Sequence, residues 1–292
     1  MLIQTDLYSF SFKLGTLVPW CKNCGAQNFY RDGKNDKGKQ LYKCKNCGFR
    51  FVWSSDLPRM NFFSNIISFA VDLYSTVGIS LRTIAQKMEK FFCVKISYEG
   101  IRQWILKCSK LHMPNIQPVS SKVWRADETY IKIKGKGFWL WIVYCHETRV
   151  VLAWHISKKR LFKDAKAVLK KAKDNAGMRP EKIITDGLYQ YQAAIKKVFG
   201  WKWNIYKKSH IVDSGIGKNA ILERLNREVK RRIKWFGTFQ ALDGAKAFFN
   251  MFFYYHNFQK INRTIGCTPN KRACVKDLTL VELLYNFPTQ GS

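Results

Sequence analysis

The sequence has 292 residues, of which 47% are apolar and 15% aromatic, enough for two or three domains with packed cores. This composition excludes a chain that is disordered throughout. With 51 Lys and Arg against 20 Asp and Glu, the formal net charge is +31, which favours a polyanionic partner over a merely well-solvated surface. Nucleic acid is the first such partner, and an anionic membrane surface is the weaker second.

No membrane partner is expected from the hydropathy pattern. The first residues lack the basic and then apolar order of a secretory signal. The most apolar stretch, 247–255, is too short to span a bilayer and contains Asn250. We therefore expect a reducing, cytoplasmic compartment, where clustered cysteines indicate a metal and scattered ones a protein core.

Residues 1–56 are expected to form an N-terminal segment with a four-cysteine unit at 17–53. Two Cys-x-x-Cys-Gly pairs stand nineteen residues apart around a predicted hairpin; the cysteines are Cys21, Cys24, Cys44 and Cys47. This spacing predicts a zinc ribbon with a structural Zn²⁺, because four thiolates leave no open position for catalysis. A redox pair and a rubredoxin-like iron site are the alternatives. Zinc would also supply folding energy that so small a core lacks.

Residues 57–112 are expected to form a helical, helix-turn-helix type domain that binds DNA. Apolar residues recur at helical spacing in three segments. Gly78 ends the first segment, and Ser80 and Ser97 are predicted N-caps of the second and third. The third helix would read DNA through exposed polar side chains, with Tyr98, Arg102, Gln103 and Lys107 as candidates. Helical trios without DNA binding are common, so the charge of the chain carries much of this prediction.

The remaining chain is expected to comprise a linker at 113–122, a catalytic domain at 123–275 and a tail at 276–292. The predicted catalytic domain begins with three antiparallel strands, 123–133, 138–145 and 150–157. A helix at 162–175, a strand at 182–186 and a helix at 188–199 follow, with a fifth strand at 203–206 and helices near 219–234 and 241–257. This is the order of an α/β ribonuclease H-like core with a mixed sheet.

Three acids, Asp127, Asp186 and Glu223, are the candidate catalytic residues. Asp127 would lie within a strand, Asp186 at the carboxyl end of a neighbouring strand, and Glu223 on a helix rich in Lys and Arg. Carboxylates converging from different elements can hold two Mg²⁺ for phosphoryl transfer. On spacing alone, a turn at Asp186-Gly187 and a surface ion pair between Glu223 and Arg227 are the more ordinary explanation of these residues.

The blocks around the acids resemble the DDE transposases of prokaryotic insertion sequences, in particular the insertion sequence six family. The gaps between the three acids are 58 and 36 residues, the second slightly longer than is usual in that family. The matching blocks are Asp127-Glu-Thr-Tyr, Ile184-Thr-Asp-Gly, Asn219…Glu223-Arg-Leu-Asn-Arg-Glu and the tail from His256-Asn257 to Thr268-Pro269. The resemblance covers roughly residues 60–275.

The resemblance implies a transposase that cleaves transposon ends and transfers the strand to target DNA. It implies two Mg²⁺, with Mn²⁺ as an alternative ion, held by Asp127, Asp186 and Glu223. The expected partners are double-stranded DNA, as terminal inverted repeats and target, and at least one further copy of the chain, near the prokaryotic nucleoid. Basic residues on the helix of Glu223 would contact phosphates: Arg224, Arg227, Lys230, Arg231 and Lys234. A non-catalytic DNA-binding regulator and a structure-specific nuclease are the alternatives.

Two nearby acids and one histidine are weaker candidates. Glu128 is expected to point to the opposite strand face from Asp127. Glu228 falls about 140° from Glu223 around a helix. His210 is a further candidate near the site, although a lone histidine is more often structural.

Overall fold

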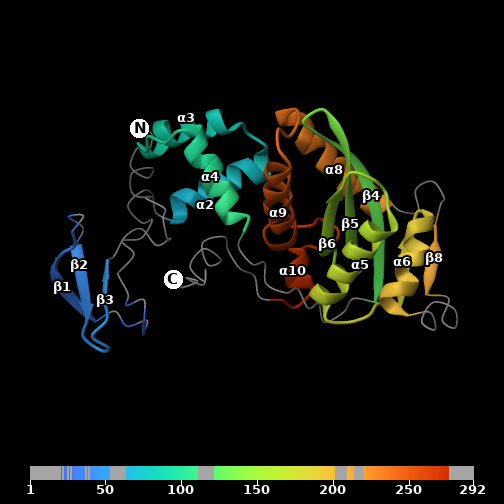
Figure 1. The fold of residues 1–292 in the computed structure, drawn as a ribbon, viewed down its shortest axis with the longest axis horizontal. Helices are drawn as coiled ribbons and strands as arrows, with labels where there is room; N and C mark the ends of the chain where they lie inside the picture. Colours follow the sequence, from blue (N-terminus) through green and yellow to red (C-terminus); the bar gives the residue numbers. More distant parts are fainter. Residues whose placement is uncertain are drawn as a thin grey trace, which may run out of the picture. The chain divides into compact units, whose positions relative to one another are not determined.

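The computed structural model describes residues 21, 23–24, 26, 28–36, 38, 40–52, 64–110, 122–200, 209–213 and 220–275 (Figure 1). Most of the predicted linker, the strand predicted at 203–206 and the tail at 276–292 lie outside these residues. The described residues divide between two compact units, one up to Ser68 and the other from Phe69.

The first unit contains a three-stranded antiparallel sheet. Its strands are β1 (Phe29–Lys34), β2 (Gln40–Cys44) and β3 (Arg50–Val52), in the order β1-β2-β3. Among the residues described in this unit, the buried core consists of Cys21, Cys44 and Phe51, with Phe29 and Tyr42 packed against it. So few apolar side chains cannot stabilise a unit of this size without a further cross-link.

Helices α2 (Ser64–Asp72), α3 (Leu81–Phe92) and α4 (Tyr98–Cys108) follow, with a π-helical turn η1 (Leu73–Val77) after α2. Gly78 ends that turn at φ 73°, as its position in the sequence indicates. Both serine caps are confirmed, because Ser80 Oγ accepts from the Thr83 amide at 3.2 Å and Ser97 Oγ from the Gly100 amide at 3.1 Å. Each such cap stabilises a helix start by about 1 kcal/mol.

A five-stranded mixed sheet forms the centre of the second unit. Its strands are β4 (Val123–Ile133), β5 (Lys136–Cys145), β6 (Val151–Ser157), β7 (Lys182–Thr185) and β8 (His210–Val212), in the order β6-β5-β4-β7-β8. Strands β4, β5 and β6 are antiparallel neighbours, whereas β7 runs parallel to β4 and β8 parallel to β7. This is the ribonuclease H-like order, and the predicted fold class of the core is confirmed.

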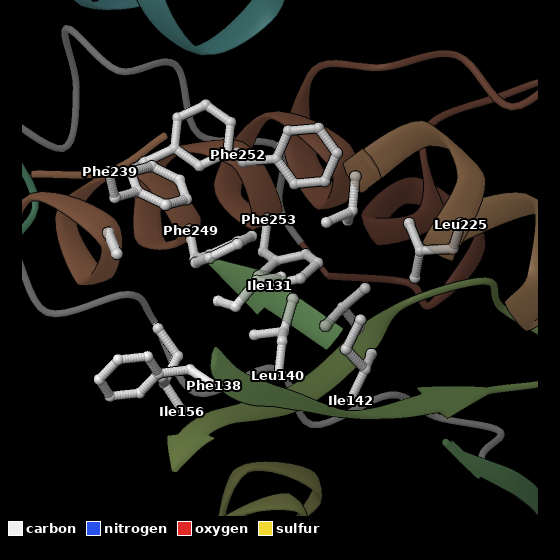
Figure 2. Packing of buried hydrophobic residues seen from close by; sticks show 14 of the residues in the cluster. Ile131, Phe138, Leu140, Ile142, Ile156, Leu225, Phe239, Phe249, Phe252 and Phe253 are labelled. Carbon is white, nitrogen blue, oxygen red and sulfur yellow. The ribbon is translucent and has the colours of Figure 1, made fainter. Parts of the chain in front are cut away.

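Helices cover both faces of this sheet (Figure 1). Helices α5 (Phe162–Ala176) and α6 (Tyr189–Phe199) pack on one face, where Trp141 meets Tyr191 with ring centroids 5.5 Å apart. Helices α8 (Ala220–Phe236) and α9 (Leu242–Phe258) pack on the other. Figure 2 shows this second layer, in which phenylalanines of α9 meet Leu140 and Ile142 of β5. A short helix, α10 (Pro269–Arg272), comes last.

Helix α9 is apolar around most of its circumference because it is covered on two sides. One side packs on the sheet, and another contacts α4 and η1. Tyr74 of η1 meets Phe248 edge-on at 5.8 Å, and Asn250 Nδ2 donates to the Ser109 carbonyl at 2.9 Å. The apolar stretch noted in the sequence is therefore a buried core helix. In the described part of the chain, no helix is long and apolar enough to cross a membrane.

Candidate active site and metal sites

Strand β7 is much shorter than β4. Asp186, which follows β7, therefore lies next to residues from both faces of β4. Strand β7 pairs with β4 only along Val123–Arg125 and ends at Thr185. Asp186 follows at once, and its Oδ1 accepts from the Leu188 amide at 3.1 Å. Because parallel strands run in step, Asp186 lies beside the next part of β4, which carries Asp127 and Glu128.

Three carboxylates form a cluster at this place. One oxygen from each of Asp127, Glu128 and Asp186 lies within 4.8 Å of the other two. Asp127 Oδ1 accepts from the Glu128 amide at 2.9 Å, and Asp127 Oδ2 accepts from Asn226 Nδ2 of α8 at 2.7 Å. Both oxygens of Asp127 are thus held in fixed directions from two elements.

Glu128 approaches the cluster from the face covered by α5 and α6. Its Oε1 accepts from Arg160 Nη1 at 2.8 Å, and the Arg160 guanidinium lies 4.1 Å from the Trp139 ring centroid. The other oxygen, Oε2, is buried and has no hydrogen bond of good geometry among the described residues, although Tyr191 interacts with this carboxylate. A buried carboxylate oxygen without a donor is unfavourable unless a cation approaches it.

The electrostatics of the cluster also favour a cation. Burial, followed by the negative charges of Glu128 and Asp186, raises the pKa of the Asp127 carboxyl to about 7. Burial raises the pKa of Glu128 as well, against the opposing effect of Arg160. Clustered carboxylates repel one another, and a divalent ion bound between them would reverse both shifts. The hard oxygen donors present here suit Mg²⁺.

Glu223, the third predicted acid, lies outside the group of three carboxylates. It is an exposed residue in the first turn of α8, whereas Leu222, Leu225 and Val229 of that helix are buried in the core. Asn226, one turn further on, makes the contact with Asp127. Residues three apart share a helix side, so Glu223 belongs to the part of α8 that adjoins the cluster.

The structure brings the weaker candidate Glu128 into the cluster, although its expected strand face is confirmed. Alternation does place it on the opposite face from Asp127, since Ile131 and Ile133 on the Asp127 side enter the α8–α9 core. Its side chain is nevertheless long enough to reach the edge of β4 beyond the end of β7, where the carboxylate cluster lies. Sequence reasoning also missed Asn226 and Arg160. Asn226 could have been identified from its spacing from Glu223, whereas no sequence signal identifies Arg160.

His210 contacts the residue before Asp186 and is not part of the carboxylate cluster. It begins β8, and its Nε2 lies 3.0 Å from Thr185 Oγ1. Burial lowers the pKa of the His210 imidazole, which favours its neutral form at pH 7. Its contact fixes the residue that precedes Asp186, a structural role.

The four predicted cysteines of the first unit converge. The Sγ atoms of Cys21 and Cys47 are 3.4 Å apart, and those of Cys24 and Cys44 are 3.6 Å apart. All four lie within 4.8 Å of one another. A tetrahedral site with Zn–S bonds near 2.3 Å requires sulfurs roughly 3.8 Å apart, so this set fits a single zinc ion.

Most of the predicted DNA-contacting residues lie on exposed helix surfaces. The five basic residues of α8 that were predicted to contact DNA are exposed, whereas the sixth, Arg232, is half-buried; the five are Arg224, Arg227, Lys230, Arg231 and Lys234. On α4, Arg102 and Gln103 are exposed, and both donate to Glu99. Lys107 is half-buried. The basic face of α8 is therefore open to a ligand, whereas a base contact by Arg102 would require it to leave Glu99.

Comparisons with known proteins agree with this geometry. Residues 121–262 match the family described as a DDE domain. The chain is 26% identical over 196 residues to the transposase for insertion sequence-like element IS431mec of Staphylococcus aureus, covering 64% of this chain and 84% of the relative. The transposase for insertion sequence element IS257 in transposon Tn4003, also from Staphylococcus aureus, matches to the same extent.

Two solved structures are also similar. The HTLV-2 integrase catalytic core domain in complex with magnesium matches with a TM-score of 0.39 and 17% identity, covering 52% of this chain and 96% of that one. A simian T-cell lymphotropic virus intasome in complex with the PP2A regulatory subunit B56 gamma matches with a TM-score of 0.41 and 14% identity, covering 72% and 76%. Residues 121–262 therefore form a DDE domain, and with the transposase relatives added to the carboxylate cluster the chain is a polynucleotidyl transferase similar to the transposases of insertion sequences.

Proposed function

We propose that this chain is a transposase that nicks the ends of its element and joins the freed 3′ hydroxyl to target DNA at one site. The observation that carries the proposal is the cluster of Asp127, Glu128 and Asp186 beside α8. Asp127, Asp186 and Glu223 would hold two Mg²⁺, or Mn²⁺ in their place. The bound ions would activate the attacking oxygen and stabilise the leaving oxygen.

The residues of the chain have separate tasks in this proposal. Asn226 orients the Asp127 carboxylate, and Arg160 orients that of Glu128. Glu223 would turn toward the cluster when cations neutralise the repulsion there. The exposed basic residues of α8 would hold the DNA backbone, with the ribbon and α4 contacting the terminal repeats. Because two element ends must be joined in one event, at least a dimer is proposed, acting on the nucleoid of a prokaryotic cell.

One assay tests the function. Labelled terminal-repeat DNA is incubated with the full chain and Mg²⁺ and scored for binding, nicking and strand joining. Metal-dependent nicking followed by joining is expected. Binding without nicking would indicate a regulator, and nicking without joining would indicate a nuclease; either result contradicts the proposal.

Glu223 and Glu128 are expected to differ in their contribution. Glu223→Gln should lower cleavage at saturating Mg²⁺ by about 10³-fold, since a lost metal ligand removes several kcal/mol of charge stabilisation. Glu128→Gln should mainly raise the Mg²⁺ concentration needed for half-maximal rate, because one Glu128 oxygen is already engaged by Arg160. Magnesium titrations of the cleavage rate measure both. The reverse order of effects would assign Glu128 as the third ligand.

The basic face of α8 is expected to set the salt dependence of DNA binding. In Arg227→Gln/Lys234→Gln, two exposed cations are removed. The slope of log K against log salt should become shallower by about 2, since each phosphate contact contributes about 0.9. Fluorescence anisotropy with a terminal-repeat duplex measures this slope. The matched control is Lys170→Gln/Arg179→Gln, exposed on the α5 side; an equal change in the control would refute a specific role for α8.

A further inference from the structure

A pocket with a volume of about 80 Å³ lies between α8, the end of α9 and the turn after β5. Three cationic side chains line it, namely Arg149, Arg224 and Lys260. Glu228 also lines it and is paired with Lys260, which leaves an excess of positive charge. Because a water molecule takes roughly 30 Å³ of liquid volume, the pocket has room for a small polyatomic group.

The wall of the pocket that carries Arg149 is held rigidly. Arg149 has φ 67°, a left-handed conformation that a non-glycine residue adopts only when its surroundings impose it. His256 Nε2 donates to the Arg149 carbonyl at 3.1 Å. Asn257 holds Val151 through both its amide and its carbonyl, at 2.9 and 3.0 Å. Two consecutive residues of α9 therefore fix the backbone from which the Arg149 side chain enters the pocket.

Two nitrogens of the Arg149 guanidinium have no acceptor within the described part of the chain, although Tyr144 interacts with this side chain. Its Nε and Nη1 are buried and have no hydrogen-bond partner among the described residues. A buried donor without an acceptor costs about 1–3 kcal/mol, and more when it is charged. An oxyanion in the pocket would offset the positive charge of this guanidinium and would find Asn262 and Thr264, two further polar residues, in the lining. Guanidinium groups match phosphate oxygens in a bidentate manner.

The pocket and the carboxylate cluster share one helix and one sheet face. Helix α8 sends Arg224 to the pocket and Asn226 to Asp127. Tyr144, which also lines the pocket, pairs with Arg125 in β4, two residues before Asp127. Two strand residues span roughly 7 Å, so a phosphate in the pocket would lie close to the DNA bond to be cut.

We propose that this pocket binds a backbone phosphate of the DNA strand and so fixes the position of the reacting bond. This proposal rests on the proposed action on DNA, but not on strand cleavage itself. The shared chemistry is a tetrahedral oxyanion, which free phosphate also supplies, so the experiment has an arm for each source.

In the first arm, binding of inorganic phosphate to the full chain is measured by calorimetry without DNA. Saturable binding is expected, with a Kd raised about tenfold in Arg149→Gln, as expected for a lost charged contact of about 1.4 kcal/mol. Arg224→Gln should weaken phosphate binding similarly. Because Arg224 is exposed, this substitution leaves the fold intact and tests the pocket even if Arg149→Gln disturbs the fold. Arg179→Gln, an exposed arginine after α5, is the matched control. Phosphate binding that is equal in all four proteins overturns the pocket.

In the second arm, affinity for a terminal-repeat duplex is measured for the same proteins at fixed salt. Arg149→Gln and Arg224→Gln are expected to weaken it about tenfold, and phosphate is expected to compete with DNA only in the wild type and in the Arg179→Gln control. Lost phosphate binding with unchanged DNA affinity would show a site for a free anion and overturn the assignment to DNA. A chain that behaves as expected here but never nicks DNA would overturn the proposed function and leave the pocket standing.

Discussion

Asp127→Asn is expected to lower Mg²⁺-dependent strand cleavage by about 10³-fold or more while DNA affinity stays within about twofold. Asp127 is the carboxylate that both β4 and α8 hold in position, through the Glu128 amide and Asn226. Losing its charge removes several kcal/mol of metal binding and charge stabilisation, and each 1.36 kcal/mol is tenfold in rate. Single-turnover cleavage of labelled terminal-repeat DNA measures the rate. Retained cleavage would refute the assignment of this site.

The same substitution is expected to stabilise the metal-free fold above pH 7. With its pKa raised to about 7, folded Asp127 keeps a proton that the unfolded chain loses near pH 4. Stability contributed by this group is therefore greatest below about pH 4 and is lost as the pH rises toward 7. Asparagine has no charge to desolvate, so at pH 8 in chelator the variant should gain up to about 4 kcal/mol. Thermal unfolding with and without Mg²⁺ checks this, and Mg²⁺ should raise Tm in the wild type only. A variant less stable than the wild type in chelator contradicts the account.

Removal of zinc is expected to unfold the four-cysteine unit and leave the ribonuclease H-like core folded. Structural zinc contributes about 10–16 kcal/mol in small zinc domains, and the buried core here is formed mainly by Cys21, Cys44 and Phe51. Cys44→Ser should abolish stoichiometric zinc binding and remove amide protection from β1–β3. Hydrogen exchange and metal analysis of the full chain measure both. Affinity for terminal repeats should fall with the unit.

The control for this prediction is a cysteine outside the cluster. Cys274→Ser alters an exposed thiol and should retain one zinc per chain and full protection of the strands. Protection that persists in a metal-free chain would show that the unit folds without a metal. Iron in place of zinc in the purified protein would favour the rubredoxin-like alternative.

The parts of the fold that were predictable depend on local chemistry. Ser80 and Ser97 cap helices because their hydroxyls accept hydrogen bonds from the backbone amides three residues later. This interaction depends only on the nearby sequence. The first three strands are long and rich in β-branched and aromatic residues, so their pattern identified them. The fifth strand, His210–Val212, has three residues, too few for any periodicity. The π-helical turn after Asp72 was likewise invisible, since its residues keep a helical pattern.

The candidate site was predictable in its acids but not in its contacts. Asp127 and Asp186 meet as their strand positions indicated. The sequence ranks Glu128 as a weaker candidate because alternation specifies only a strand face. Whether a glutamate side chain reaches around the strand edge depends on where the neighbouring strand ends. Arg160 contacts Glu128 across 32 positions of the chain, a tertiary relation that no local pattern encodes. Glu223 and its role remain a prediction.

The short length of β7 has a consequence for how this site can vary. The strand stops at Thr185, and the carboxylates gather in the room beside β4 that a longer strand would fill. Two residues inserted after Thr185 in register would put main chain where Asp127, Glu128 and Asp186 now meet, with every acid still present. An insertion at this point would therefore disrupt the site, and the length of β7 constrains the chemistry as strictly as the charges do.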